Sequence, residues 1–324
     1  MATLTGLPDG LVARPLVHDD LTAVFDVMVA DEQAVLGEAM IDLEDLEADW
    51  HRPSYDSEHD SVGVFDGGRL VAYGEVYQGR RAEITVHPQE CGRGIGTALM
   101  RWSWQRATEA GGTLVGQSVP DQASGAIALF RRHGYQQLWT SWFLALPADA
   151  RLPDVQLPSG YGIRSFRPGS DEQAAYRVIE DAFSEWPDRD ASSYDDWAAT
   201  VLGRPGFEPW HLSLAVHVDD SADGERREEV VGACHLLLIG ETGWVNQVAG
   251  AAAHRRRRLA QALLARAFAD ARGHGAPRAE LATDSRTGAL GLYEHLGMQV
   301  TEAFTHWARR LDDVELAAGR GPVG

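Results

Sequence analysis

Apolar and polar positions follow two different spacings along the first half of this chain, and both spacings return in the second half. Two short, largely apolar segments run from Ser61 to Phe65 and from Leu70 to Tyr77, on either side of the turn Asp66-Gly67-Gly68. This arrangement predicts a β-hairpin. Further along, apolar residues recur at helical spacing from Ile95 onwards, which predicts an amphipathic helix with one buried stripe.

The second half predicts the same elements in the same order. A hairpin is predicted from His211 to Val218 and Val230 to Ile239, and a long helix from the apolar stripe that begins at Leu259. In each half a strand and helical segments precede the hairpin, while a further strand, a shorter helix and closing strands follow the long helix. Strands and helices mixed around one sheet indicate an α/β fold in both halves.

Short sequence repeats indicate that the two halves are copies of one domain. The segment LPDGLVAR at Leu7 returns as LPSGYGIR at Leu157, and LFRRHGY at Leu129 returns as LYEHLGM at Leu292. The repeats stay in the same order along both halves, which chance matches would not do. We therefore predict an N-terminal domain over 1–147, a linker over 148–158, a C-terminal domain over 159–312 and a tail over 313–324, close to the usual size of about 100 to 200 residues per domain.

The stretch ITVHPQECGRGIGTALM, from Ile84 to Met100, carries the strongest chemical signal. It predicts a strand, a glycine-rich turn and a helix, so that backbone N–H groups gather at a helix N-terminus and favour an anion. A nucleotide P-loop requires a lysine, and this chain has none. The glycines Gly92, Gly94 and Gly96 follow a GxGxG spacing, which differs from the GxGxxG of dinucleotide-binding domains. The turn is therefore expected to hold a phosphate of another kind.

With Val86 and Pro88 ahead of it, this turn resembles the acetyl-CoA loop of the GNAT N-acetyltransferases, usually (Q/R)xxGx(G/A), with Cys91 in place of the first residue. The whole chain resembles a tandem GNAT protein, in which Arg255 corresponds to Cys91. The resemblance implies two GNAT-like domains, each a mixed, mostly antiparallel sheet flanked by helices. It also implies acetyl-CoA as the cosubstrate.

The two loops are not equally suited to that role. The first copy keeps its glycines, and its expected cofactor-binding residues are Ile84, Thr85, Val86, Cys91, Gly92, Arg93, Gly94, Ile95, Gly96 and Thr97. The second copy has Arg255, Arg256, Arg257 and Arg258 instead, which would either contact phosphates or form a solvated basic turn. We expect acetyl-CoA to bind the first copy, and leave open whether the second copy binds it.

Acetyl transfer to an amine requires a base and an acid. Glu83 and Glu75 are the candidate bases of the first copy, with solvated strand-end carboxylates as the alternative, and Glu241 is their nearest counterpart in the second. GNAT enzymes often use a tyrosine of an LYxxxGF motif as the acid. Tyr293 matches it, unless this ring only packs in the core, whereas the first copy has Phe130. Catalysis in the first copy would then proceed without Tyr293.

Composition excludes several classes of protein. A net charge of −19 argues against a nucleic-acid partner, and no run of 18 apolar residues predicts a membrane span. The two cysteines lie at non-equivalent places in the two halves, which fits a protein of the reducing cytoplasm. No metal is expected, because no His, Cys, Asp or Glu cluster has metal-ligand spacing. An arginine-only set of basic side chains is typical of a GC-rich bacterial genome. The oligomeric state stays open between monomer and homodimer.

The function expected from this resemblance is an acetyl-CoA-dependent N-acetyltransferase. It would move acetyl to a small-molecule primary amine by direct attack, because no nucleophile motif appears. One copy would be catalytic and the other degenerate. The alternative is a non-catalytic protein that binds or senses acyl-CoA, since neither copy keeps the full set of groups.

Overall fold

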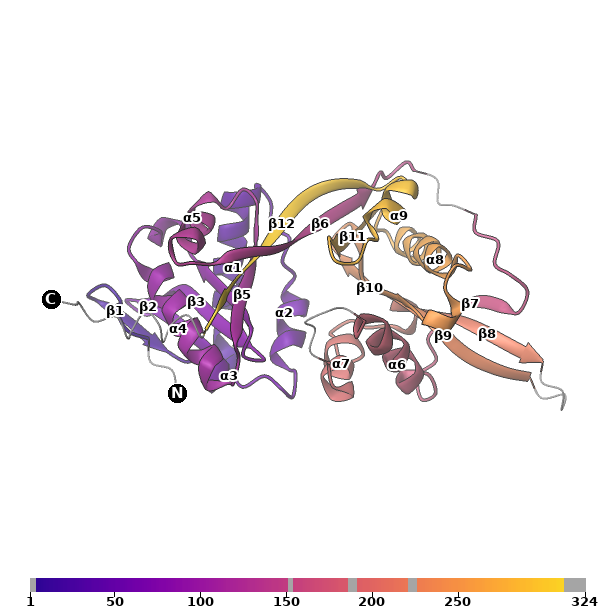
Figure 1. The fold of residues 1–324 in the computed structure, drawn as a ribbon, viewed down its shortest axis with the longest axis horizontal. Coiled ribbons are helices and arrows are strands. Elements are labelled where there is room, and N and C mark those ends of the chain that lie inside the picture. Colours follow the sequence, from indigo (N-terminus) through magenta and orange to yellow (C-terminus); the bar gives the residue numbers. More distant parts are fainter. Residues whose placement is uncertain (1–3, 151–153, 186–190, 221–225, 312–324) are drawn as a thin grey trace. The chain divides into compact units, whose positions relative to one another are not determined.

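The computed structural model describes residues 4–150, 154–185, 191–220 and 226–311. These residues form two compact units (Figure 1). Unit 1 contains the described residues up to Thr140 together with those from Phe304, and unit 2 runs from Ser141 to Ala303. Among the described residues, no helix combines the length and apolarity needed to cross a bilayer.

The first repeat forms a regular series of strands and helices. Its elements are β1 (Leu11–Arg14), η1 (His18–Asp20), α1 (Leu21–Leu36), α2 (Leu43–Trp50), α3 (Ser57–Asp60), β2 (Ser61–Asp66), β3 (Arg69–Tyr77), β4 (Arg81–Val86), η2 (Pro88–Glu90), α4 (Ile95–Glu109), β5 (Leu114–Pro120), α5 (Ser124–Arg132) and β6 (Gln136–Leu146). The predicted hairpin is β2–β3 and the predicted long helix is α4, so both expectations are confirmed.

The second repeat forms a similar series, with fewer helical segments before its hairpin. Its elements are β7 (Tyr161–Ser165), α6 (Glu172–Phe183), α7 (Tyr194–Val201), η3 (Pro209–His211), β8 (Leu212–Asp220), β9 (Arg226–Ile239), β10 (Thr242–Gly250), η4 (Ala252–His254), α8 (Leu259–Gly273), β11 (Arg278–Asp284), α9 (Leu290–His295) and β12 (Gln299–Arg310). The hairpin β8–β9 and the helix α8 lie where the apolar pattern predicts them.

Each unit has a mixed, mostly antiparallel sheet. In unit 1 the strands follow the order β1-β2-β3-β4-β5, and in unit 2 the order β7-β8-β9-β10-β11. Neighbours pair in antiparallel fashion except β4 with β5 and β10 with β11, which are parallel. The expected α/β architecture is therefore confirmed.

The closing strand of each repeat pairs with a strand of the other repeat. Phe304 to Arg310 of β12 pair with β5, and Ser141 to Leu146 of β6 pair with β11. The compact units therefore do not coincide with the sequence repeats 1–147 and 159–312. The end of β6 lies in unit 2, and the end of β12 lies in unit 1. Because the two repeats offer equivalent sheet edges, the sequence pattern of a closing strand does not reveal which edge it joins.

Helices cover both faces of each sheet. In unit 1, α4 packs on one face through Leu99, while Val24 of α1 lies in a second core cluster with Tyr73 of β3. In unit 2, α8 packs on one face through Leu263, while α6 and α7 cover the other face around Trp197. Leu99 and Leu263 are fully buried, so truncating either to alanine should cost about 2–5 kcal/mol of stability.

Candidate active site

The turn before the long helix has the same backbone shape in both repeats. Helix α4 begins at Ile95 and α8 begins at Leu259, an offset of 164 (259 − 95) that also places Arg255 on Cys91. Gly92 and Gly94 have φ of +82° and +89°, and their counterparts Arg256 and Arg258 have φ of +63° and +65°. A left-handed arginine costs about 1–2 kcal/mol, and such strain is concentrated at functional sites.

The helix N-termini present free amides at each turn. The first intrahelical bond of α4 runs from Ala98 N to Gly94 O (3.1 Å), and that of α8 runs from Ala262 N to Arg258 O (3.0 Å). The N–H groups ahead of these have no acceptor within their own helix. Neither N-cap residue, Gly94 or Arg258, supplies a side-chain acceptor. Both turns therefore have the geometry that binds an anion.

The charges around the two turns differ. In unit 1, the guanidinium of Arg93 forms ion pairs with Glu90 and with Asp66, the latter at 3.3 Å. Glu90 also pairs with Arg69 at 2.6 Å. Hydrogen bonds from Arg93 and Arg69 hold the pKa of the Glu90 carboxyl below its usual range. Arg93 is thus neutralised by carboxylates that would repel a phosphate.

The turn of unit 2 keeps an excess of positive charge. Arg255 pairs with Glu185 at 2.6 Å, and Arg257 donates to the carbonyl oxygen of Ala253 at 3.0 Å. Arg256 and Arg258 form no ion pair or side-chain hydrogen bond with the residues that the structure describes. Guanidinium groups without a carboxylate partner favour phosphates.

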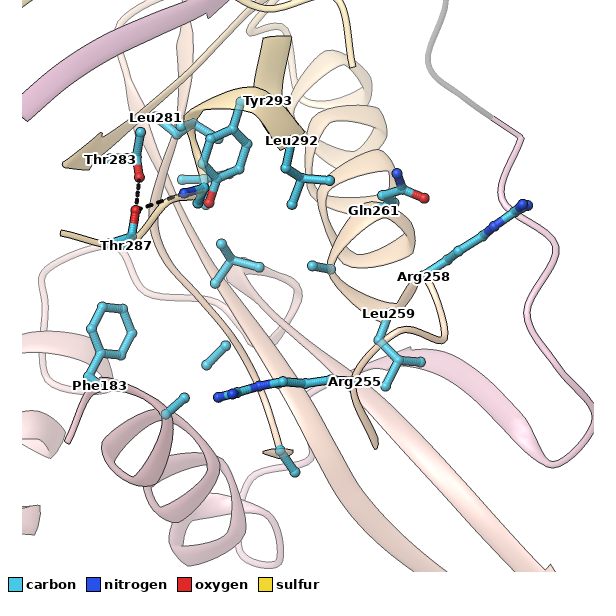
Figure 2. Close-up of a pocket in the computed structure, with 18 of the residues that line it drawn as sticks. Phe183, Arg255, Arg258, Leu259, Gln261, Leu281, Thr283, Thr287, Leu292 and Tyr293 are labelled. Carbon is cyan, nitrogen blue, oxygen red and sulfur yellow. Dashed lines mark hydrogen bonds between the residues drawn. The ribbon is translucent and has the colours of Figure 1, made fainter. Parts of the chain in front are cut away.

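A cavity of about 550 Å³ opens beside the turn of unit 2 (Figure 2). Phe183 at the end of α6 lies on one side, and Leu292 and Tyr293 of α9 lie on the other. The N-terminus of α8 and the facing parts of β10 and β11 complete the wall. This volume is within the range of small-molecule sites in proteins.

The cavity exists because β10 and β11 separate. They pair only from Thr242 with Arg278 to Val245 with Leu281. At that point β10 has a β-bulge at Asn246, opposite β9. From Asn246 to Gly250 the β11-facing edge of β10 has no strand partner among the described residues. Unpaired strand edges can be completed by an extended, amide-containing ligand.

In unit 1 the equivalent gap, between the diverging strands β4 and β5, is bridged by a side chain. Strands β4 and β5 pair only at Arg81 with Gly116. Next along β5, the buried Gln117 donates from Nε2 to the carbonyl oxygen of Ile84 at 2.9 Å. Its counterpart in unit 2 is Leu281, which cannot donate. The pairing of β4 with β3 is continuous, without a bulge. The part of β4 expected to face the cofactor is therefore already hydrogen-bonded.

The two candidate bases of unit 1 lie opposite each other. Glu75 on β3 is the cross-strand partner of Glu83 on β4, on the face that α1 covers. Burial raises the pKa of each carboxyl to about 7. Glu75 also accepts hydrogen bonds from Trp50 Nε1 and Tyr55 Oη, both 2.9 Å long. A carboxyl whose pKa is near neutrality can act as a general base.

The register places different residues at these positions in unit 2. His235 and Gln247 form the cross-strand pair there, whereas Glu241 is exposed in the turn between β9 and β10. Glu241 is therefore not the structural counterpart of Glu75 or Glu83. Burial lowers the pKa of His235 to about 3, and its Nδ1 lies 3.4 Å from Nδ2 of Asn246 at the cavity wall. The sequence repeats do not reveal this pair, because the hairpins differ in length and β10 contains the bulge.

Tyr293 lies in the cavity wall, with its hydroxyl end turned towards the cavity (Figure 2). Burial raises the pKa of its hydroxyl to about 12, so that it carries a proton at neutral pH. Phe130, at the same place in unit 1, stacks on Tyr135 with ring centroids 4.9 Å apart. Cys91 is exposed, and partial desolvation raises the pKa of its thiol, which disfavours the nucleophilic thiolate.

Comparisons with known proteins agree with the repeats. Residues 57–137 match the profile of the acetyltransferase (GNAT) domain, and residues 173–298 match that of the acetyltransferase (GNAT) family. A mycothiol acetyltransferase of Salinispora arenicola is 32% identical over 81% of this chain and 83% of its own length. Another of Nocardioides sp. is 29% identical over 89% and 96%. A third, of Frankia casuarinae, is 33% identical, but this match spans only 48% of this chain and 46% of that protein.

Solved structures share the fold over nearly the whole chain. A GCN5-related N-acetyltransferase from Sphaerobacter thermophilus superposes with a TM-score of 0.72 at 28% identity, covering 94% of this chain and 97% of that one. A tandem GNAT protein of the clavulanic acid biosynthesis pathway superposes with a TM-score of 0.69 at 18% identity, covering 97% and 100%. The chain belongs to the GNAT acetyltransferase family. It is an acyltransferase with two GNAT domains, and acyl-CoA is the acyl donor of such enzymes.

Proposed function

We propose that this protein is an acetyl-CoA-dependent N-acetyltransferase that acts on a small-molecule primary amine, with its transfer site in the cavity of unit 2. One observation carries the proposal: the cationic turn, the unpaired edge of β10 and Tyr293 all line the same cavity. The relatives named mycothiol acetyltransferases support a small-molecule acceptor. Unit 1 would then be the partner domain, with its gap closed by Gln117.

The described residues of unit 2 fit the parts of acetyl-CoA. Arg256, Arg258 and the first amides of α8 would hold the phosphates. The edge of β10 from Asn246 to Gly250 would pair with the amides of the pantetheine arm. When bound, acetyl-CoA supplies the acetyl group as a thioester. This arrangement leaves the bulge of β10 and Tyr293 at the reacting end of the cavity.

Two groups at that end match the demands of the transfer. A backbone N–H freed by the bulge at Asn246 can donate to the oxygen that gains negative charge. Tyr293 can donate its proton to the departing sulfur, because its raised pKa keeps it protonated at neutral pH. The amine itself would act as the nucleophile. Cys234 is fully buried, with the pKa of its thiol raised to about 12, and so is not an acyl carrier.

The amine must lose a proton, and unit 2 has no carboxylate at the positions of Glu75 and Glu83. Burial lowers the pKa of His235 to about 3, so its neutral imidazole is too weak a base to take a proton from the amine at neutral pH. Water in the cavity would therefore carry the proton away. The absence of a carboxylate from this cross-strand pair is the observation that favours the second candidate function, acyl-CoA binding without transfer.

The sequence-based assignment of catalysis to the first repeat stays a prediction. The near-neutral pKa of Glu75 and Glu83 favours it, whereas the bridge from Gln117 to Ile84 opposes it. A thiol-release assay with a panel of primary amines would test the proposal. We expect amine-dependent release of CoA that is lost in Tyr293→Phe and kept in Glu83→Gln. Stoichiometric binding of acetyl-CoA without release, for every amine, would support the binding function instead.

A further inference from the structure

Two histidines and a glutamate meet on the surface of unit 1, away from the groups discussed so far. His18 lies in η1, and Glu47 and His51 lie on α2. One ligand atom from each residue lies within 4.8 Å of the other two. Because His18 is 29 residues (47 − 18) from Glu47, spacing along the sequence did not reveal this cluster.

The local fold explains why the three side chains converge. Glu47 and His51 are four residues apart on one helix, so they share a face. The rings of His18 and His51 have centroids 5.2 Å apart, with planes at 74°. Two imidazoles bound to one tetrahedral ion through bonds of about 2.0–2.1 Å would have centroids roughly 5 Å apart. The histidines are thus already spaced as two ligands of one ion.

A hydrogen bond fixes which nitrogen of His51 is available. Its Nδ1 lies 2.7 Å from the carbonyl oxygen of Glu47, and because a carbonyl only accepts, Nδ1 carries the proton. The lone pair of His51 is therefore on Nε2. Metal-binding histidines are commonly oriented in this way, with the other ring nitrogen donating to a backbone carbonyl. This bond leaves Nε2 of His51 as the nitrogen that can bind an ion.

We propose that His18, Glu47 and His51 form a binding site for a divalent transition metal ion, and that zinc is the ion that fits it best. Two imidazoles and one carboxylate are ligands that zinc accepts, with water in the fourth position. His18 and His51 are exposed, so an ion can enter from solvent. The site is independent of the proposed transferase function.

The expected consequence is a link between η1 and α2. Helix α2 also carries Trp50, which donates to Glu75 in the sheet. An ion held by His18 and His51 would fasten the end of β1 to this helix, because η1 follows β1 directly. A ligand that binds only the folded state stabilises it by mass action. Zinc should therefore raise the melting temperature of the protein.

The test uses the full-length, tag-free protein, freed of metal with a chelator and titrated with Zn²⁺ by calorimetry. We expect one ion per chain, a rise of several degrees in melting temperature, and a visible Co²⁺ spectrum of tetrahedral intensity. His18→Ala and His51→Ala should each weaken binding at least thirtyfold. His59→Ala is the matched control, because His59 is an exposed histidine of the same unit that pairs with Asp56.

Circular dichroism in the absence of metal should show that the variants are folded. If His51→Ala does not fold, His51→Gln keeps a polar side chain and replaces it in the test. Zinc binding that is unaffected by both the His18 and the His51 variants would overturn the proposal. So would an affinity for Zn²⁺ weaker than millimolar in the unaltered protein.

Discussion

Gln117 donates a hydrogen bond across the gap between two diverging strands to the carbonyl oxygen of Ile84, at 2.9 Å. Leu281 occupies the same place in unit 2 and makes no such bond. The gap between β4 and β5 in unit 1 is thus bridged by a side chain, whereas the gap between β10 and β11 in unit 2 opens into a cavity of about 550 Å³.

Placing an amide in the gap of unit 2 should close it. In Leu281→Gln the new side chain would be able to donate to the carbonyl of Val248, the counterpart of Ile84. We expect acetyl-CoA affinity to fall at least tenfold, about 1.4 kcal/mol, by calorimetry. Leu281→Met, which preserves volume, is the control and should bind as the unaltered protein does. Equal affinities in both variants would argue against the gap as the cofactor site.

Exchanging glycine and arginine between the two turns should distinguish the backbone strain of a left-handed arginine from its contribution to acetyl-CoA binding. Arg258→Gly removes a left-handed arginine, so the protein should gain about 1 kcal/mol of stability. It also removes a cation, so acetyl-CoA affinity should fall about tenfold. Gly94→Arg is the matched change in unit 1 and should leave affinity unchanged. Urea unfolding and calorimetry measure the two effects, and a loss of affinity only in Gly94→Arg would assign the cofactor to unit 1.

Removing the Tyr293 hydroxyl should slow the reaction without weakening cofactor binding. Loss of a general acid commonly costs on the order of a hundredfold or more in rate, and we expect this fall in kcat for Tyr293→Phe. The KM for acetyl-CoA should stay the same, because the ring is retained. Glu83→Gln serves as the comparison and should keep its rate. A fall in kcat for Glu83→Gln, with no change for Tyr293→Phe, would place the active site in unit 1.

The partly buried carboxyls of Glu75 and Glu83 should make the stability of the protein depend on pH. Burial raises the pKa of Glu83 from 4.5 to about 7, so the folded state binds this proton more tightly than the unfolded state. Stability therefore falls as pH rises between these two values. Glu83→Gln should be close to neutral at pH 4.5 and should stabilise the protein by about 1–3 kcal/mol at pH 8.

Urea unfolding at both pH values measures that difference. Glu38→Gln, at an exposed carboxylate of the same unit, is the control and should change stability little at either pH. A Glu83→Gln variant that is no more stable than the unaltered protein at pH 8 would contradict the raised pKa. The measurement needs no substrate, so it is independent of where the chemistry occurs.

Much of the local structure could be predicted from the sequence. The two apolar segments between Ser61 and Tyr77 form a hairpin, as predicted, and the repeats predicted that Arg255 occupies the place of Cys91. These features depend on near neighbours along the chain, which periodicity and turn residues report directly. Glu75 and Glu83 could also be selected as carboxyls of neighbouring strands, and the structure places them opposite each other.

The sequence by itself thus determined two copies of one α/β domain, their order of elements and the position of the turn before each long helix. Only the tertiary structure decided that a cavity opens between β10 and β11, that His235 takes the place of Glu75, and that the rings of His18 and His51 are in contact. It also decided that each closing strand pairs with a strand of the other repeat. These outcomes depend on where strands diverge, on a bulge that shifts register, and on contacts between distant residues, none of which leaves a periodic pattern along the chain.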